Sequence, residues 1–272
     1  MKDYPALDLH ASDVDLLYAA LDDFGPTAIE ETGNGVRAYF LTAADRDAAL
    51  FSLSDHFPAS PLEVSDDDWA RRSQENLSPV TVGRITIVPD QPSSAALQTA
   101  DFVFLVIVPS MGFGTGHHAT TRLCLEALQT IDLRNKRVVD VGTGSGVLAL
   151  AARALGAACA SGVDFDPDAI QSARENLALN PGLSAVTFEV ADLNSAALGL
   201  AQPADVVTAN LTGALLVRAA PTLIAATTEG GILILSGLMA TERDEVIAAF
   251  RPGTVIWERT EDEWVGLAVK KA

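Results

Sequence analysis

Three glycines and a later carboxylate form the pattern with the clearest chemical meaning in this chain. Gly142, Gly144 and Gly146 follow a short apolar run, and Asp164 comes about twenty residues after them. Glycine lets the backbone turn sharply and approach a ligand closely. A carboxylate at that distance, at the end of the next strand, can accept hydrogen bonds from ribose hydroxyls. The pattern predicts a nucleoside-binding loop, with a tight structural turn as the alternative.

The spacing of the glycines separates two classes of cofactor. Enzymes that bind dinucleotides use G-x-G-x-x-G, in which the third glycine seats the helix beneath a pyrophosphate. Here Val147 follows Gly146, so the pattern is G-x-G-x-G. That spacing favours a ligand without phosphates, and the segment resembles motif I of the S-adenosylmethionine (SAM) methyltransferases. A dehydrogenase is therefore the less favoured class.

A second glycine-rich segment, residues 109–121, contains an aromatic residue, two adjacent histidines and two threonines. Its alternating glycines indicate backbone that lies against a ligand. Thr120 can serve as the N-cap of a helix expected at residues 121–128. A metal site at His117 and His118 is not indicated, because adjacent side chains diverge and no third ligand is near in the sequence.

The segment from Phe113 to Leu123 looks like the signature of the PrmA family, which methylates protein eleven of the large ribosomal subunit. That signature reads F-G-T-G-x-H-x-T-T, and this chain keeps all its fixed positions. The resemblance extends over nearly the whole chain through further segments: 68–69, 138–166, 209–211, 236–238 and 263–264. The chain departs from the family pattern at Ser110, Gly112 and residues 211–214.

The resemblance implies the doubly wound, mostly parallel, seven-stranded Rossmann-like sheet of the class I SAM methyltransferases, in the α/β class. It implies SAM as the cofactor and S-adenosylhomocysteine (SAH) as the product. Asp192 is then expected at the adenine amino group, or else is a plain loop acid, and Phe113 is expected beside the transferred methyl group. The expected cofactor-binding residues are Thr115, Thr121, Gly142, Gly144, Gly146, Asp164, Asp192 and Asn210. The expected catalytic residues are Asn210 and Phe113.

Asn210 follows a strand expected at residues 204–209 and is the residue most suited to act on a methyl acceptor. The sulfur of SAM is a sulfonium and leaves as a neutral thioether, so no acid is needed to protonate it. In-line attack by a neutral amine on the methyl group is enough. A lysine amine has a reference pKa of about 10.4, and an apolar environment lowers that pKa. The Asn210 carbonyl can orient an N–H of the amine, so that catalysis rests largely on positioning. A simple turn residue is the alternative role for Asn210.

The elements that must position these residues form two domains and a connection. Residues 1–64 read as βαββαβ, with a hairpin turn at Gly33-Asn34-Gly35, and predict a small α+β ferredoxin-like domain for substrate recognition. Residues 65–79 predict a linker helix. Residues 80–272 alternate strands and helices and predict the doubly wound methyltransferase domain, where ligands bind at the carboxyl ends of strands. Its first strands are expected at 81–88, 102–108 and 138–141.

The charge balance limits the class of partner. The 272 residues include 36 acidic and 18 basic side chains, for a net charge of −18. Binding to nucleic acid relies on Lys and Arg, so no direct nucleic-acid contact is expected, and a basic protein partner suits this surface. We expect neither a disulfide framework nor a metal site, because Cys124 and Cys159 lie among apolar residues without a Cys/His cluster. No signal segment or membrane-spanning run is evident, so a cytoplasmic location is expected.

Together these patterns predict a SAM-dependent N-methyltransferase that acts on lysine side chains or N-terminal amines of a protein, most plausibly a free large-subunit ribosomal protein. A small-molecule methyltransferase with the same core is one alternative. A SAM-binding protein without catalysis is another. The separate N-terminal domain and the acidic surface favour the protein substrate.

Overall fold

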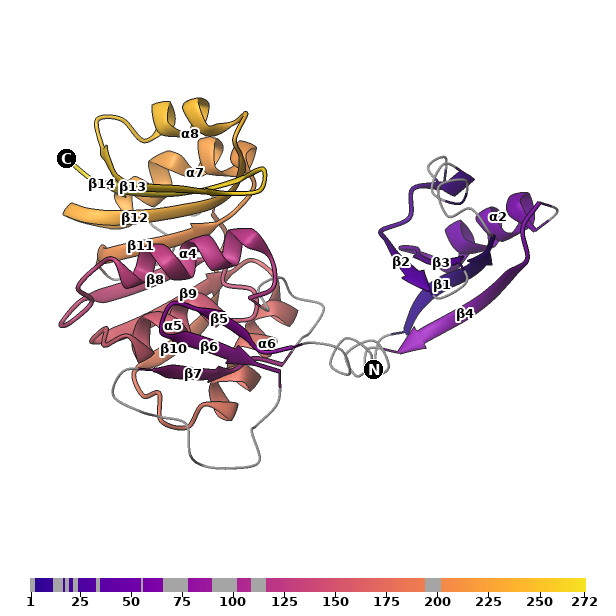
Figure 1. The fold of residues 1–272 in the computed structure, drawn as a ribbon, viewed down its shortest axis with the longest axis horizontal. Coiled ribbons are helices and arrows are strands. Elements are labelled where there is room, and N and C mark those ends of the chain that lie inside the picture. Colours follow the sequence, from indigo (N-terminus) through magenta and orange to yellow (C-terminus); the bar gives the residue numbers. More distant parts are fainter. Residues whose placement is uncertain are drawn as a thin grey trace. The chain divides into compact units, whose positions relative to one another are not determined.

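In the computed structural model, the chain divides into two compact units, Met1–Asn76 and Leu77–Ala272 (Figure 1). The structure describes residues 3–11, 17, 20–21, 24–32, 35–54, 56–65, 78–89, 102–108, 116–193 and 202–272. Most of the predicted linker helix, residues 65–79, lies outside these ranges. The predicted domain boundaries therefore stay a prediction.

The smaller unit contains an antiparallel sheet with the strand order β2-β3-β1-β4. Its described elements are β1 (Asp3–His10), β2 (Ala28–Thr32), β3 (Gly35–Tyr39), α2 (Ala43–Leu53) and β4 (Ala59–Ser65). Thr42 begins α2 by accepting a 3.2 Å hydrogen bond from the N–H of Asp45. Leu17 and Leu21 are helical and fully buried, but most of the predicted helix before β2 lies outside the described residues. The ferredoxin-like assignment stays a prediction.

A seven-stranded sheet forms the centre of the larger unit, with the order β10-β9-β8-β11-β12-β14-β13. Its strands are β8 (Arg137–Val141), β9 (Cys159–Asp164), β10 (Val186–Val190), β11 (Ala204–Asn210), β12 (Thr227–Met239), β13 (Thr254–Glu261) and β14 (Trp264–Lys270). The five strands β10, β9, β8, β11 and β12 are parallel to one another. β14 is antiparallel to both of its neighbours, β12 and β13. This arrangement confirms the predicted mostly parallel α/β sheet.

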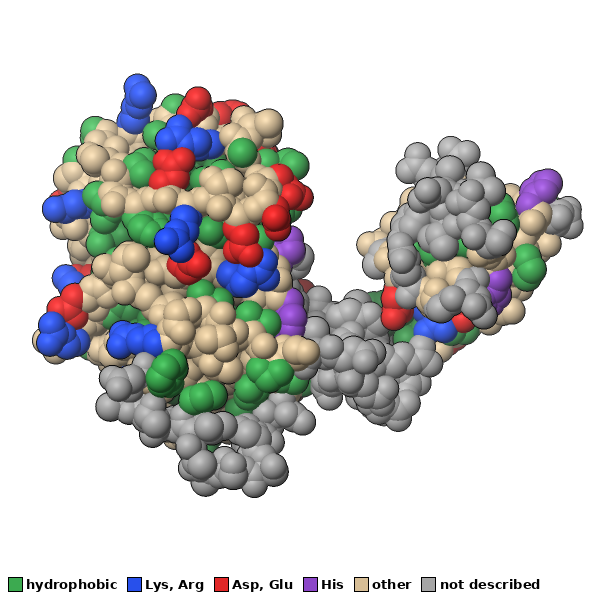
Figure 2. Space-filling view, viewed as in Figure 1, with side chains coloured by type: hydrophobic (Ala, Val, Ile, Leu, Met, Phe, Trp, Pro, Cys, Tyr) green, Lys and Arg blue, Asp and Glu red, His purple; other side chains and the backbone are tan. Residues whose placement is uncertain are grey.

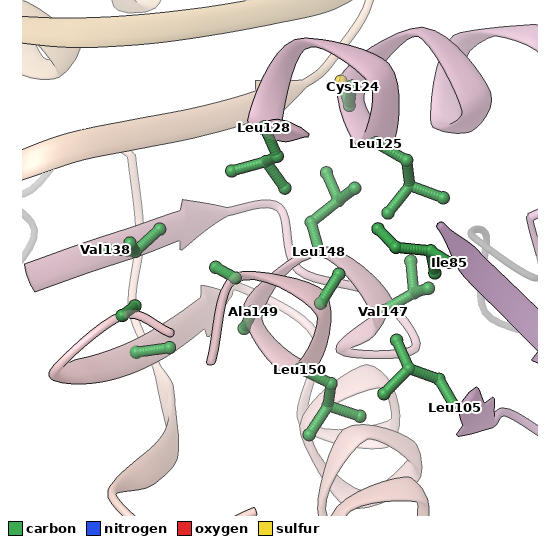
Figure 3. Close-up of a cluster of buried hydrophobic side chains, with 14 of the residues drawn as sticks. Ile85, Leu105, Cys124, Leu125, Leu128, Val138, Val147, Leu148, Ala149 and Leu150 are labelled. Atoms are coloured by element: carbon green, nitrogen blue, oxygen red, sulfur yellow. The ribbon is translucent and has the colours of Figure 1, made fainter. Parts of the chain in front are cut away.

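Helices cover both faces of this sheet (Figure 1). The helices are α4 (Ala119–Gln129), α5 (Val147–Ala154), α6 (Pro167–Leu179), α7 (Gly213–Ala225) and α8 (Arg243–Ala249). Successive strand side chains point to opposite faces, so Val138 packs with α4, α5 and α6, whereas Val139 packs with α7 and α8. In Figure 3 the side chains of α4 and α5 meet, and Ile85 and Leu105 join them from a second sheet. This packing explains why α5 is apolar on nearly all sides.

The second sheet has three strands, β5 (Val80–Val82), β6 (Ile85–Val88) and β7 (Val103–Val106). The prediction of one strand at residues 81–88 was wrong, because Gly83 has a φ of +57° and turns the chain into an antiparallel pair. Gln129, at the end of α4, holds this turn: it accepts a 2.9 Å hydrogen bond from Arg84 N–H and donates a 3.0 Å bond to Val82 O. The turn was missed because its support comes from a distant part of the chain.

Candidate active site

The carboxyl ends of β8, β9, β10 and β11 form one edge of the central sheet. In the ladders, Val141 pairs with both Val163 and Ala209, and Val190 pairs with Asp164. Ligands of open α/β sheets bind at this edge. The predicted residues that the structure places there are Gly142, Gly144, Gly146, Asp164, Asp192 and Asn210.

The glycine loop, residues 142–146, has a backbone shape that needs glycine. Gly142, Gly144 and Gly146 have φ angles of +71°, +50° and +82°, a region that other residues seldom adopt. The N–H groups of Gly142 and Thr143 donate to the carbonyl of Val163 at 2.9 and 3.0 Å. Gly146 is the N-cap of α5 in the left-handed conformation. The loop is therefore tied to β9 at its start and leads directly into a buried helix at its end.

The carboxylate of Asp164 takes part in shaping this loop. Its Oδ2 accepts a 3.0 Å hydrogen bond from Gly144 N–H, and its Oδ1 accepts a 3.1 Å bond from Asp166 N–H. Each carboxylate oxygen has a further lone pair, so both can still accept from ribose hydroxyls. Phe165 follows directly and is 76% exposed, an unusual state for an aromatic residue beside a predicted ligand site. Sequence reasoning missed Phe165, although its place after Asp164 was a usable signal.

Asp140 joins the glycine loop to the neighbouring strand and was not predicted as a site residue. Its Oδ2 accepts a 2.7 Å hydrogen bond from the hydroxyl of Thr143, and its Oδ1 accepts a 2.6 Å bond from Thr208. The residue is only 1% exposed. Burial raises the pKa of the Asp140 carboxyl to about 6, against the two hydroxyl hydrogen bonds, which lower it. One buried carboxylate thus connects the loop after β8 with the strand that ends at Asn210.

Thr121 and Asn210 meet across a separation of 89 residues. The amide Nδ2 of Asn210 donates a long 3.4 Å hydrogen bond to the hydroxyl oxygen of Thr121, which is fully buried on α4. Asn210 ends β11 and is half-buried. Because the side-chain amide is planar, its Oδ1 atom is directed away from Thr121. That oxygen can accept a hydrogen bond from an amine.

The start of α4 differs from the prediction. The N-cap is His118 rather than Thr120, and the His118 ring nitrogen Nδ1 accepts a 3.4 Å hydrogen bond from Thr120 N–H. The same ring meets Trp264 edge to face, with 5.0 Å between the ring centroids. His117 Nε2 donates a 3.1 Å hydrogen bond to Ser78 O. Both histidines therefore have structural contacts at the end of the glycine-rich segment.

Two ion pairs connect α4 with β13. Arg122 donates from Nε and Nη2 to Glu261 Oε1 at 2.8 and 2.5 Å, and from Nη1 to the carbonyl of His117. Four residues along the helix, Glu126 accepts a 2.7 Å hydrogen bond from Arg259. Figure 2 shows basic and acidic side chains next to one another on the visible face of the larger unit. The first of these pairs lies at the residue after Thr121 and therefore helps to hold the start of α4, whose Thr121 contacts Asn210.

Close packing sets the position of Leu211, the residue after Asn210. A Cβ atom at Gly142 would lie 2.6 Å from the Leu211 Cδ2 atom. A Cβ at Gly237, whose φ is +87°, would lie 2.4 Å from the Leu211 carbonyl oxygen. Gly213 also has a packing reason, because a Cβ there would lie 2.5 Å from the Glu242 carboxyl carbon. The segment 211–214, which departs from the family pattern, is thus fitted to its neighbours.

Two buried asparagines, one within α6 and one at its C-cap, were missed by sequence reasoning. Asn176 accepts from Val108 N–H at 2.9 Å and donates to the Ser145 carbonyl at 2.9 Å. Asn180 accepts from Val106 N–H at 3.0 Å and donates to Val106 O at 2.8 Å. Their spacing of four residues places them on one face of the helix, beside β7. That spacing was the available signal, but it does not reveal a partner.

Two predicted site residues, Phe113 and Thr115, lie outside the described residues. Asp192 follows β10 and has an exposed side chain. Among the described residues, no group of three or more His, Cys, Asp or Glu side chains is arranged to hold a metal ion. No helix in the described ranges has the length and apolar character needed to cross a membrane.

Comparison with known proteins gives consistent matches over most of the chain. The family model described as ribosomal protein L11 methyltransferase (PrmA) matches residues 23–272. A ribosomal protein L11 methyltransferase from Deinococcus radiodurans is 40% identical over 265 residues, which are 96% of this chain and 93% of that protein. One from Geobacter sulfurreducens is 38% identical over 274 residues, covering 95% of this chain and 89% of that protein.

Solved structures agree with these matches. The crystal structure of a ribosomal protein L11 methylase from Lactobacillus delbrueckii subsp. bulgaricus has a TM-score of 0.63 and 26% identity, covering 72% of this chain and 100% of that chain. A putative methyltransferase in complex with SAH shares the fold at a TM-score of 0.50 and 12% identity, covering 60% of this chain and 52% of that one. The family model and the relatives together span most of the sequence, and the chain therefore belongs to the ribosomal protein L11 methyltransferase (PrmA) family.

Proposed function

We propose that this chain transfers methyl groups from SAM to amines of ribosomal protein L11, on lysine side chains, on the N-terminal amine, or on both. Membership of the family makes the chain a SAM-dependent protein methyltransferase. The choice of an amine as acceptor is our proposal. The observation that carries it is the pairing of Asn210 with Thr121 at the same sheet edge as the glycine loop and Asp164.

The cofactor is proposed to lie along this edge with its ribose at Asp164. Both carboxylate oxygens of Asp164 keep a free lone pair, and their backbone bonds to Gly144 and Asp166 hold them in place. The exposed ring of Phe165 is available to stack against the adenine, whose amino group we expect near Asp192. The remaining proposed contacts are Gly142, Gly146, Thr115 and Thr121. SAM supplies an activated methyl group when bound there.

The acceptor amine is proposed to approach the Oδ1 atom of Asn210. The carbonyl accepts an N–H of the neutral amine, and the lone pair is thereby turned toward the methyl group. Thr121 keeps the side chain in that orientation through the 3.4 Å bond to Nδ2. No side chain is needed to protonate a leaving group, so the contribution of Asn210 is orientation. Phe113 is proposed beside the methyl group.

The protein substrate is proposed to be free L11 in the cytoplasm, recognised through the smaller unit. The chain has 36 acidic and 18 basic side chains, and this negative balance favours a basic protein as partner and opposes contact with phosphates. The relatives with this name are methyltransferases of ribosomal protein L11. The smaller unit contributes no residue to the proposed cofactor site, so substrate recognition is the role we assign to it.

The test is methylation of purified L11 by the full chain with isotopically labelled SAM, followed by peptide mass spectrometry. The L11 is taken from cells that lack this methylation, so that its amines are free. We expect label on lysine ε-amines or on the N-terminal amine. Label confined to carboxyl or amide side chains would contradict the amine acceptor. Label on RNA but not on L11 would contradict the protein substrate.

A further inference from the structure

We infer that Asn176 is a positioning residue for the cofactor, because its buried amide joins the glycine loop to the chain that follows β7. This inference rests on the proposed placement of SAM on the glycine loop. Asn176 lies on α6, outside the loop itself, and we assign it no contact with SAM. Its effect on the cofactor passes through the backbone of Ser145.

Both ends of the Asn176 amide are used inside the protein. Its Oδ1 accepts from Val108 N–H at 2.9 Å, and its Nδ2 donates to Ser145 O at 2.9 Å. Asn176 is 1% exposed and Ser145 is fully buried, so water cannot easily replace either bond. Val108 is the last described residue before the segment 109–115. One side chain therefore joins the glycine loop to the residue that directly precedes the glycine-rich segment 109–121 in the sequence.

The glycine loop needs such a bond because of its composition. Ser145 stands between Gly144 and Gly146, whose φ angles are +50° and +82°. Glycine can adopt many backbone conformations, so the peptide groups beside Ser145 can rotate at little steric cost. The peptide between Ser145 and Gly146 is held on both sides, by the Asn176 bond to its carbonyl and by a 2.9 Å bond from Gly146 N–H to Thr143 O. The preceding residue, Gly144, donates its N–H to Asp164, so a shift of the loop at Ser145 would reach the carboxylate proposed to hold the ribose.

Asn180, the C-cap residue directly after α6, provides a comparison four residues further along the chain. It is 8% exposed and ties α6 to β7 through two hydrogen bonds with Val106, at 3.0 and 2.8 Å. It also donates a 2.7 Å bond to Asn176 O. None of these three bonds reaches the glycine loop. Asn180 therefore shares the burial and the structural role of Asn176 without its link to Ser145.

The experiment compares Asn176→Asp with Asn180→Asp in the full chain. Each change keeps the shape of the side chain and replaces an NH₂ donor by an oxygen that faces a carbonyl. We expect a drop in thermal midpoint in both variants, at least as large for Asn180→Asp, since Asn176→Asp loses one donated buried hydrogen bond and Asn180→Asp loses two. We expect the Kd of SAH, measured by calorimetry well below both midpoints, to rise about tenfold for Asn176→Asp and less than about twofold for Asn180→Asp.

Steady-state kinetics give a second measurement. In Asn176→Asp the KM for SAM should rise about tenfold while kcat at saturating SAM stays within about threefold, because the acceptor side is untouched. SAH affinity that is unchanged in both variants, or that falls by the same factor in both, would reduce Asn176 to a structural residue and overturn the inference. If an Asp variant does not fold, Asn176→Ala and Asn180→Ala carry the same comparison with the same expectations.

A further variant separates this inference from the proposed placement of SAM. Asp164→Ala should weaken SAH binding if the ribose lies at Asp164. If Asp164→Ala loses affinity while Asn176→Asp does not, only the role of Asn176 fails. If Asp164→Ala binds SAH as tightly as the unchanged chain, the placement of the cofactor fails, and the inference fails with it.

Discussion

Buried and part-buried hydrogen bonds of 2.6 to 3.0 Å fix the proposed cofactor half of the site, whereas the proposed acceptor half depends on a 3.4 Å bond between Asn210 and Thr121. In the cofactor half, Asp140, Asp164 and Asn176 each bind a different residue of the glycine loop. The acceptor half is supported by ion pairs between α4 and β13 that are partly exposed. The cofactor half is therefore preformed, and small shifts are easier in the acceptor half.

This difference predicts that changes on the two sides affect different quantities. Changes in the cofactor half should appear in SAM or SAH affinity, because the loop shape is what the buried bonds maintain. Changes in the acceptor half should appear in the methylation rate, because a positioned reaction is sensitive to small misplacements. A variant that changed both quantities equally would contradict the division.

The largest effect is expected at Asn210. Asn210→Ala removes the group proposed to orient the amine, so the single-turnover rate of methylation should fall roughly 10²-fold. SAH affinity should fall much less, because the glycine loop and Asp164 are unchanged. A rate equal to that of the unchanged chain would leave Asn210 as a turn residue at the end of β11. Calorimetry on the same preparation provides the affinity.

Asn210→Asp tests the same group in another way. Its carboxylate can still accept an N–H, but its charge would also stabilise the protonated amine and raise the pKa of that amine. The neutral amine would then be abundant only at higher pH, so the pH optimum of the rate should move upward. If the pH optimum of Asn210→Asp were unchanged while Asn210→Ala was inactive, the introduced carboxylate would have to lie away from the amine.

A smaller effect is expected at Asp164. Asp164→Ala removes both side-chain oxygens proposed to accept from the ribose, and losing these hydrogen bonds should weaken SAH binding roughly 30-fold. Asp166→Ala is the control, because Asp166 caps α6 through a 2.9 Å bond from Asp168 N–H and is not assigned to the cofactor. The control should lower the thermal midpoint while leaving SAH affinity close to that of the unchanged chain. Equal affinity losses would remove the ribose assignment.

The next effect concerns stability and pH at Asp140. Its pKa is raised from 3.8 to about 6 in the folded protein, so the folded state binds more protons than the unfolded state between these values. The contribution of Asp140 to stability therefore falls as pH rises, and about 1 kcal/mol should be lost between pH 5 and pH 8. Asp140→Asn has no such titration. The difference in unfolding free energy between variant and unchanged chain, measured by urea denaturation, should shift by that amount.

The smallest effect is expected at the ion pairs of α4. Both pairs are partly exposed, and such pairs are worth little in stability. Glu261→Gln loosens Arg122, next to Thr121, and should lower the rate about twofold to threefold. Arg259→Gln breaks the pair with Glu126 farther along the helix and should leave the rate unchanged. Equal rates in the two variants would show that α4 is held by packing alone.

Local patterns were the part of the site that the sequence could predict. The glycine loop and Asp164 lie within one β-turn-α-β unit, and the spacing itself reveals their relation. The sheet followed from alternating strands and helices, and the structure confirms it. Thr121 and Asn210, which are 89 residues apart, were each assigned to the site through the resemblance to a family, but the hydrogen bond between them was not predicted. Spacing alone could not have paired these two residues.

Long-range polar contacts were the part that could not be predicted. Asn176 and Asn180 look like surface residues of an amphipathic helix, because polar residues usually face solvent there. Their burial depends on β7, which lies more than 60 residues away, with separations of 68 and 74 residues. Arg122 and Glu261 are separated by 139 residues. A sequence shows that such residues can form hydrogen bonds, but the fold chooses the partners.

The two glycines that contact Leu211 should differ in whether a second mutation can suppress their loss. A methyl group at Gly142 would meet the end of the Leu211 side chain, whereas one at Gly237 would meet its backbone, at 2.4 to 2.9 Å. Shortening Leu211 removes the first clash but not the second, and the strain of a positive φ remains at both positions. Suppressors at position 211 should therefore rescue Gly142→Ala in part and Gly237→Ala not at all. Glycine at position 237 is consequently under a stricter evolutionary constraint than glycine at position 142, because the segment next to Asn210 cannot make room for a side chain there.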